Sequence, residues 1–248
     1  MHRCSIVIPA RIASTRLPGK MLKSLGGKPV VQHVIERTQK VRNCQSVYVV
    51  TDSNEIVQLA NSLGVTGLLT APECRSGTER IVSVLNEIAG DWIFNVQGDE
   101  PFVDIHLIEE MIDRTRNTQA DILTPVYRLK SIEEVLNPNV VKVVRNVDDF
   151  ALYFSRSPIP FVRDIPKEEW LQKTTFWGHL GIYGYQRTVL ETYSKIPLSP
   201  LEQAESLEQL RFLSNNFRIL TCETQNRSVA IDTAEDLALA EKILGESH

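Results

Sequence analysis

Three cations crowd the loop that follows the first apolar segment of the chain. The stretch IPARIASTRLPGK, residues 8–20, carries Arg11, Arg16 and Lys20 close to Gly19. Like charges at this spacing repel one another unless an anionic group lies between them. Guanidinium forks, a lysine ammonium and backbone N–H groups near a glycine are the donors that hold phosphate oxygens. These residue types favour a phosphate-bearing ligand over a solvated loop whose cations face water, and we test the hypothesis that this ligand is a nucleoside triphosphate.

This loop differs from the two common phosphate-binding motifs. It contains neither the G-x-x-x-x-G-K-[ST] spacing of a Walker A loop nor the G-x-G-x-x-G spacing of a dinucleotide site. A pair of glycines in LGGKPV, residues 25–30, is better explained as a turn before a helix that begins at Pro29.

Two aspartates follow apolar runs that predict strands. Asp99 ends the run 92–99, where Gly98 permits a turn, and Asp232 follows the short run VAI. Mg²⁺ typically binds one or two carboxylates together with substrate phosphates and water. The alternatives are a helix cap or a solvated turn residue at Asp99, and at Asp232 an N-cap whose capping box Glu235 completes.

A third polar cluster lies in HLGIYGY, residues 179–185. Alternation in a single strand would put His179, Gly181, Tyr183 and Tyr185 on one face. Aromatic faces and polar edges suit a polyhydroxylated acid. A half-buried structural face would have the same composition, so both interpretations stay open on the residues alone.

Composition and charge argue against several classes of function. The net charge of -4 over 248 residues disfavours nonspecific binding to nucleic acid or acidic membranes. No apolar run approaches the ~18 residues of a membrane-spanning helix, and the N-terminal run predicts a strand rather than a signal peptide. Four scattered cysteines predict reduced thiols in the cytosol. The five histidines lack the spacing of a zinc site.

The elements that must position these residues alternate in the first half of the chain. Apolar runs predict strands at 4–10, 46–52, 65–70 and 91–101, and amphipathic stretches predict helices at 28–41, 54–64 and 77–90. Beyond residue 120 we expect a hairpin at 140–154, strands at 179–185 and 217–223, and helices at 187–195, 201–213 and from 233. The pattern predicts an α/β fold: a mostly parallel central sheet with helices on both faces and an inserted smaller sheet or hairpin region. Such sheets bind ligands beyond the carboxyl ends of their strands.

Seven segments together resemble one family. In chain order they are IPARIASTRLPGK, SGTER, NVQGDEP, ALYFSRSPIP, HLGIYGY, LEQLR and IDTAEDL. This order is similar to that of the bacterial 3-deoxy-manno-octulosonate cytidylyltransferases, the CMP-Kdo synthetases. The resemblance implies one Rossmann-like nucleotidyltransferase domain over residues 1–248. Its nucleotide-binding half would span about 1–120, its sugar-binding and dimerisation part about 121–230, and a metal ligand with the C-terminal helix 231–248.

The resemblance also implies roles for individual residues around CTP. It implies phosphate contacts for Arg11, Arg16 and Lys20, and further nucleotide contacts for Pro9, Ala10, Ser14, Arg75, Ser76 and Gly77. The segment 75–80 would read the cytosine, and Ser76 with Gly77 would also suit a helix start.

The resemblance favours metal binding for both aspartates. Asp99 and Asp232 would hold Mg²⁺ and, with Arg16 and Lys20, form the catalytic set; a second Mg²⁺ is compatible with this scheme. The chain departs from the family at Ala234, because IDTAEDL replaces the usual DTPEDL. The missing proline is expected to loosen the helix start without removing the ligand.

For the sugar, the resemblance implies contacts from Gln97, Arg163, His179, Tyr183, Tyr185 and Glu208. Arg163 is the candidate for the sugar carboxylate, because its fork binds two oxygens.

The implied activity is transfer of a cytidylyl group from CTP to Kdo, with release of pyrophosphate, for lipopolysaccharide synthesis. The expected setting is a cytoplasmic homodimer that binds neither nucleic acid nor the membrane interior. A cytidylyltransferase for a related acidic sugar, such as amino-substituted Kdo or sialic acid, is the first alternative. The second is a module that binds CTP without turnover, against which the paired aspartates argue.

Overall fold

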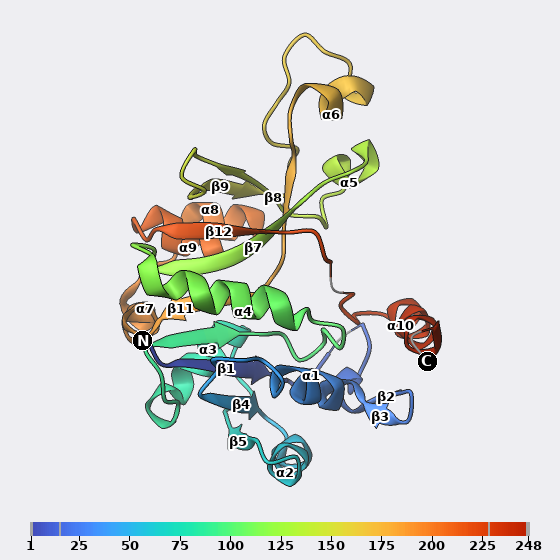
Figure 1. Cartoon of the computed structure of the whole chain (residues 1–248), viewed down its shortest axis with the longest axis vertical. Helices are drawn as coiled ribbons and strands as arrows, with labels where there is room; N and C mark the ends of the chain where they lie inside the picture. Colours follow the sequence, from blue (N-terminus) through green and yellow to red (C-terminus); the bar gives the residue numbers. More distant parts are fainter. Residues whose placement is uncertain (1, 15, 228, 247–248) are drawn as a thin grey trace. The chain divides into compact units, whose positions relative to one another are not determined.

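The computed structural model describes residues 2–14, 16–227 and 229–246. The chain divides into two compact units, and Figure 1 colours it along the sequence. Unit 1 comprises residues 1–116, 184–191 and 228–248, and unit 2 comprises residues 117–183 and 192–227.

Unit 1 is built on parallel strands. β1 (Cys4–Pro9) pairs in parallel with β4 (Ser46–Thr51) and with β6 (Trp92–Asn95), and β5 (Thr66–Leu69) pairs in parallel with β4. β11 (Tyr183–Gln186) follows β6 in the strand order. Every residue of β1 is buried, as expected for a parallel strand covered on both faces. The predicted strands in the first half of the chain and the predicted α/β fold class are therefore confirmed.

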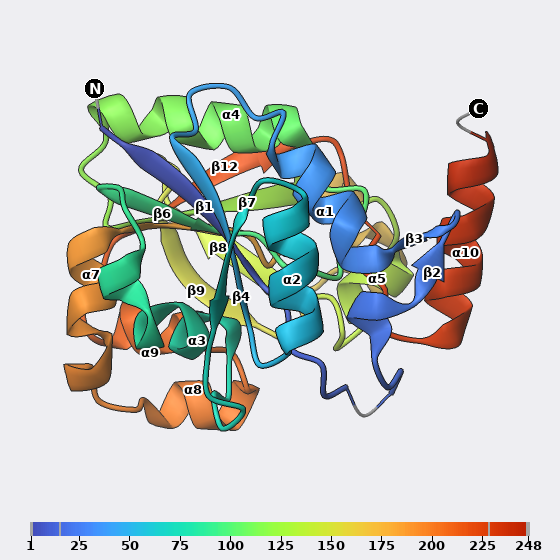
Figure 2. The same cartoon turned by 90° about the horizontal axis from the view of Figure 1, so that it is seen from below.

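Helices cover both faces of these strands. Figure 2 shows α4 (Ile105–Arg114) and α3 (Gly77–Ser83) on opposite sides of β1. The unit also contains α1 (Val30–Thr38), α2 (Asn54–Ser62), α7 (Arg187–Thr192), α10 (Ala234–Glu246) and the 3-10 helices η1 (Lys20–Leu22) and η2 (Leu85–Glu87). η3 (Thr115–Asn117) lies where the chain passes into unit 2.

Two local predictions in unit 1 have different outcomes. The turn at LGGKPV is confirmed, because β2 (Ser24–Leu25) and β3 (Lys28–Pro29) pair across Gly26 and Gly27, whose φ angles are 56° and 81°. The single helix expected at 77–90 is wrong. α3 ends at Ser83 because Val84 has left the helical region with φ −124°, and η2 follows.

A small apolar cluster joins the first loop to the last helix. Leu17 of the loop and Ala240 of α10 are buried together with Leu25, Val30 and Ile231. This packing brings the segment that contains Asp232 to the loop that contains the cations.

Unit 2 has a mixed sheet. β12 (Ile219–Thr224) pairs in parallel with β7 (Ile122–Arg128), while β10 (Trp177–His179) pairs antiparallel with β7 and with β8 (Lys142–Arg145). β8 and β9 (Ala151–Ser155) form the predicted hairpin. The helices are α5 (Ile132–Leu136), α6 (Trp170–Lys173), α8 (Pro200–Glu205), α9 (Gln209–Ser214), η4 (Lys167–Glu169) and η5 (Tyr193–Lys195). No helix within the described ranges is long and apolar enough to cross a membrane.

The single strand expected at 179–185 is wrong. β10 ends at His179 and β11 begins at Tyr183. The intervening turn is held by β7, since the N–H of Leu180 donates to Pro125 O and the Thr124 hydroxyl donates to Ile182 O. The helix expected at 201–213 also divides, because Ser206 takes a left-handed conformation with φ 53°.

Candidate active site

The cationic loop is anchored to the end of β4. The N–H of Ala10 donates to Val50 O at 2.9 Å, and the hydroxyl of Thr51 donates to Ala10 O at 2.5 Å. The N–H of Ile12 donates to Asp52 Oδ1 at 2.9 Å. The first residues of the loop are therefore fixed at the carboxyl ends of β1 and β4, where parallel sheets bind ligands.

The far end of the loop turns inward at Gly19. This residue has φ 66°, a left-handed conformation that favours glycine. Lys20 follows it at the start of η1, and only 7% of its side chain is exposed. The turn thus directs a buried ammonium toward the strand ends, whereas the side chain of Arg16 is 66% exposed.

The two aspartates meet at Lys20. The N–H of Ile231 donates to Asp99 O at 2.9 Å, which places Asp232 beside Asp99. Lys20 Nζ lies 2.5 Å from Asp99 Oδ2 and 2.7 Å from Asp232 Oδ1, and Arg16 Nη2 lies 3.0 Å from Asp232 Oδ2. The structure thus brings together the residues predicted as the catalytic set.

Charge pairing overcomes burial at this cluster. Burial alone would lower the pKa of Lys20, but the charges and hydrogen bonds of Asp99 and Asp232 raise it above its ordinary value. Burial alone would raise the pKa of Asp232, but Lys20, Arg16 and Arg11 hold it below its ordinary value. Both groups are therefore charged at neutral pH.

Asp232 does not cap α10. The Thr233 hydroxyl accepts the N–H of Asp236, and the Asp236 carboxylate accepts the N–H groups of Thr233 and Asp232. The capping box therefore joins Thr233 and Asp236, and the alternative that gave this role to Asp232 and Glu235 is wrong. The Asp232 carboxylate is directed to cations instead.

A cavity of about 210 Å³ opens beside these charges. Its lining is Pro9, Arg11, Lys20, Met21, Cys74, Arg75, Ser76, Gly77, Arg80, Gln97, Asp99 and Asp232. A side chain at Gly77 would begin 3.1 Å from the Pro9 ring, so glycine permits the close approach of α3 to the loop. Of the other predicted nucleotide residues, Ala10 is buried, Ser14 is partly exposed, and neither belongs to this lining.

The start of α3 forms one wall of the cavity. The Ser76 hydroxyl accepts the N–H of Glu79 at 3.1 Å, so Ser76 is the predicted helix cap. Arg75 pairs with Glu79 at 3.0 Å and its side chain is 72% exposed. Arg75 and Ser76 therefore both meet Glu79 of the first helical turn, and both line the cavity.

Asp52, a buried acid next to the site, was missed in the sequence, and Arg80 was predicted only as the end of the cytosine-reading segment 75–80. Arg80 lines the cavity and is 2% exposed; its guanidinium donates to Thr70 and lies 3.5 Å from the buried Asp52 carboxylate. Asp52 therefore links the loop, through Ile12, to α3. Its position at the end of a predicted strand, like that of Asp99, is the signal that could have identified it.

The predicted sugar-binding residues are divided between the units. In unit 1, Gln97 lines the cavity and donates to Asn95 Oδ1, and the buried Tyr185 has its hydroxyl 3.4 Å from Thr78 Oγ1. The structure thus places Gln97, but not Tyr185, in the lining of the cavity.

In unit 2, three of these residues form a group. The rings of His179 and Tyr183 lie 5.4 Å apart, and the Tyr193 hydroxyl donates to Glu208. Burial, with a smaller contribution from the Glu208 charge, raises the pKa of Tyr183. Burial lowers the pKa of His179 to about 3. The group therefore offers a neutral imidazole and a neutral phenol beside a carboxylate.

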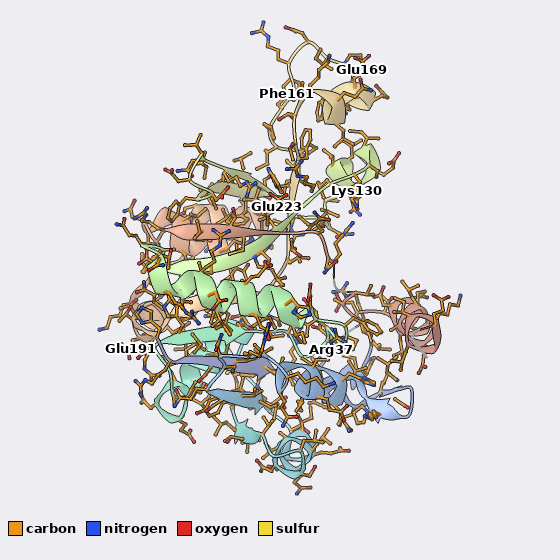
Figure 3. All side chains as sticks on the ribbon, viewed as in Figure 1. Arg37, Lys130, Phe161, Glu169, Glu191 and Glu223 are labelled. Atoms are coloured by element: carbon orange, nitrogen blue, oxygen red, sulfur yellow. The ribbon has the colours of Figure 1, made fainter. Side chains whose placement is uncertain are left out.

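Arg163 lies apart from that group, on the loop between β9 and α6. Its side chain is 87% exposed and pairs with the equally exposed Asp164 at 3.2 Å. Figure 3 shows Phe161 of the same loop on the part that projects beyond β8 and β9. The guanidinium is accessible to a ligand, but the structure does not bring it to His179.

Comparisons with known proteins agree on one family. A cytidylyltransferase family profile matches residues 5–220. The 3-deoxy-manno-octulosonate cytidylyltransferases of Geobacter sulfurreducens and Thermodesulfovibrio yellowstonii are 42% and 40% identical over 246 residues, with 96% of each chain covered. A solved CMP:2-keto-3-deoxy-manno-octonic acid synthetase in complex with CTP superposes with a TM-score of 0.93 at 38% identity, covering 99% of this chain and 100% of the other.

A more distant structure shares the fold alone. A putative glucose-1-phosphate thymidylyltransferase from Bacillus anthracis has a TM-score of 0.68 at 14% identity over 97% of this chain.

Proposed function

Because the chain belongs to the family of 3-deoxy-manno-octulosonate cytidylyltransferases, we propose that it transfers a cytidylyl group from CTP to Kdo. The products are CMP-Kdo and pyrophosphate. The anomeric hydroxyl oxygen of Kdo attacks the α-phosphorus, the bond from that phosphorus to the pyrophosphate oxygen breaks, and the hydroxyl proton is released. No covalent intermediate with the protein is required.

One observation carries this proposal beyond family membership. Asp99, Asp232 and Lys20 meet at the edge of a cavity that the cationic loop and α3 also line. Phosphoryl transfer depends chiefly on positioning and charge stabilisation. A cavity lined by Arg11, Lys20, Asp99 and Asp232 offers cations and carboxylates for both purposes. Arg11 and Lys20 line this cavity and would hold phosphate oxygens, and the exposed Arg16, which pairs with Asp232, would assist them.

The two carboxylates fit Mg²⁺. Oxygen ligands from one or two acids, completed by phosphates and water, are the donor set that this ion prefers. Among the described residues no group of three or more histidine, cysteine or acidic side chains forms a metal site, so substrate oxygens would have to complete the coordination. When bound, Mg²⁺ would neutralise phosphate charge and lower the pKa of a coordinated hydroxyl. Lys20 pairs with both of these carboxylates.

The wider setting belongs to the same proposal. A cytoplasmic homodimer that supplies CMP-Kdo for lipopolysaccharide synthesis is supported by the family resemblance. The four cysteines form no disulfide in the structure, as is usual in a reducing compartment; they are Cys4, Cys44, Cys74 and Cys222.

Pyrophosphate release with a panel of substrates tests the proposal. CTP, UTP, ATP and GTP would each be combined with Kdo, amino-substituted Kdo and sialic acid, with and without Mg²⁺. We expect turnover with CTP, Kdo and Mg²⁺ together. Turnover with sialic acid but not with Kdo would overturn the substrate assignment, and CTP binding without pyrophosphate release would indicate a binding module.

A further inference from the structure

Thr124 is a buried residue of unit 2 whose hydroxyl lies between two hydrogen-bonding partners. It belongs to β7 and has no exposed surface. Its Oγ1 lies 2.8 Å from His179 Nε2 and 2.8 Å from the carbonyl oxygen of Ile182. The carbonyl oxygen of Leu180 lies farther away, at 3.4 Å.

Counting protons fixes the direction of both short hydrogen bonds. A threonine hydroxyl has one proton, and a carbonyl oxygen can only accept. The Thr124 proton is therefore directed to Ile182 O, and Oγ1 must accept from His179. It follows that Nε2 of His179 carries the imidazole proton and that Nδ1 is unprotonated.

The surroundings of the ring agree with a neutral imidazole. Phe154 meets the His179 ring edge-on, with centroids 5.1 Å apart, and Tyr183 lies at 5.4 Å. Burial lowers the pKa of His179. His179 is mostly enclosed but keeps some exposed surface, and within the described part of the chain no donor is hydrogen-bonded to Nδ1. A ligand therefore meets an acceptor rather than a cation at this atom.

We propose that Thr124 is a positioning residue that holds His179 in the Nε2–H tautomer, so that Nδ1 accepts a hydrogen bond from a hydroxyl of the sugar acid. The identity of the ligand rests on the proposed function, whereas the tautomer does not. This arrangement selects a donor at that point of the sugar. A sugar acid with a methyl ether or a keto group there would leave Nδ1 without a partner.

Nitrogen NMR of the protein labelled with ¹⁵N-histidine tests the tautomer without any substrate. The His179 signals are identified as those that a His179→Gln protein lacks. We expect a protonated Nε2 and an unprotonated Nδ1 at neutral pH. A proton on Nδ1, or a doubly protonated ring, would overturn the proposal.

Kinetics test the consequence for the sugar. Thr124→Val keeps the shape of the side chain but removes the hydroxyl, so it should raise KM for Kdo by about five- to tenfold, the effect of one neutral hydrogen bond. KM for CTP should not change. Thr124→Ser, which keeps the hydroxyl, should have the wild-type KM for Kdo and the wild-type tautomer signals. Equal losses for Kdo and CTP, or no loss for Kdo, would overturn the positioning role.

The two measurements separate this inference from the proposed function. If no sugar acid is turned over, the proposed function fails, yet the wild-type spectrum still supports or overturns the tautomer. If Thr124→Val does not fold, the wild-type nitrogen spectrum still decides the tautomer. A raised KM for Kdo in Thr124→Ser would then overturn the claim that the hydroxyl at this position is sufficient.

Discussion

At the scale of single residues, the ammonium of Lys20 lies between two carboxylates from distant parts of the chain. Asp99 and Asp232 accept two of its three N–H donors. Within the described residues these are the two acceptors of the Lys20 ammonium. Lys20 thus holds the two carboxylates close together.

Asp99→Asn should reduce turnover by about two to three orders of magnitude, the range seen when one charge-stabilising group is lost. The substitution removes a negative charge but keeps the side-chain shape, and Asp232 still pairs with Lys20. Pyrophosphate release and circular dichroism on the same sample would measure activity and folding. Asp113→Asn, which changes an acid with 57% exposure on α4, is the matched control and should retain the wild-type rate. A wild-type rate for Asp99→Asn at limiting Mg²⁺ would contradict direct coordination.

Arg163→Ala should raise the Kdo concentration for half-maximal rate by about ten- to a hundredfold, because a charge-assisted hydrogen bond is worth roughly 1.5–3 kcal/mol. The requirement for CTP should barely change. Initial rates would be measured at varied Kdo with fixed CTP, and then at varied CTP with fixed Kdo. The two series give the half-maximal concentration of each substrate separately. Arg16→Ala is the companion variant, and it should weaken the use of CTP instead. Loss of CTP binding in Arg163→Ala with Kdo unaffected would show that another cation binds the sugar carboxylate.

At the scale of elements, the beginning of α10 explains how Asp232 is free to meet Lys20. Thr233 and Asp236 satisfy the first N–H groups of the helix, so the carboxylate of Asp232 is not needed there. The helix begins at Ala234, the position at which the family resemblance places a proline. Asp232 pairs with Lys20 although the chain departs from the family at Ala234; the looser helix start stays a prediction.

Ala234→Pro should stabilise the protein by about 0.4–1 kcal/mol, because proline suits the first helical position and restricts the unfolded chain. Ala234 is exposed. Calorimetry should show a melting temperature higher by about 1–4 °C. Ala238→Pro makes the same change at an exposed position inside α10 and should instead destabilise by about 3 kcal/mol or more. A lower melting temperature for Ala234→Pro would show that the helix start cannot accept the ring.

At the scale of the whole molecule, charge pairing at the site links stability to pH. The folded pKa of Asp232 is lower than its ordinary value. A carboxylate of this kind stabilises the folded state fully above its unfolded pKa of about 3.9, and the contribution is lost as the pH falls through the lower, folded pKa. The raised pKa of Lys20 acts in the opposite range, since its contribution is lost only as the pH rises through the folded value.

Asp232→Asn should therefore lower the melting temperature at pH 7, and its difference from wild type should shrink as the pH falls from 5 toward 3. Thermal unfolding followed by circular dichroism at several pH values would measure this difference. Asp113→Asn should show no deficit at pH 7, since Asp113 lies on the surface of α4. A deficit of Asp232→Asn that stays constant or grows toward pH 3 would contradict the assigned pairing.

The sequence by itself determined the features that depend on neighbouring residues. The buried strand predicted at 4–10, which the structure has at 4–9, the turn at Gly26 and Gly27, and the Ser76 cap are confirmed. Each depends on local backbone preference or on hydrophobic periodicity, which a short window contains. The cationic loop is local in the same sense, because Arg11, Arg16 and Lys20 are close in the chain.

Only the tertiary structure decided which distant residues meet. Lys20 and Asp232 are 212 positions apart, and packing of Leu17 against α10 together with the Ile231–Asp99 hydrogen bond brings them into contact. The alternation at 179–185 predicted one strand, yet β10 ends at His179 and β11 begins at Tyr183, and hydrogen bonds to β7 hold the turn between them. Contacts between distant residues arise from the packing of whole elements, which a local pattern does not encode.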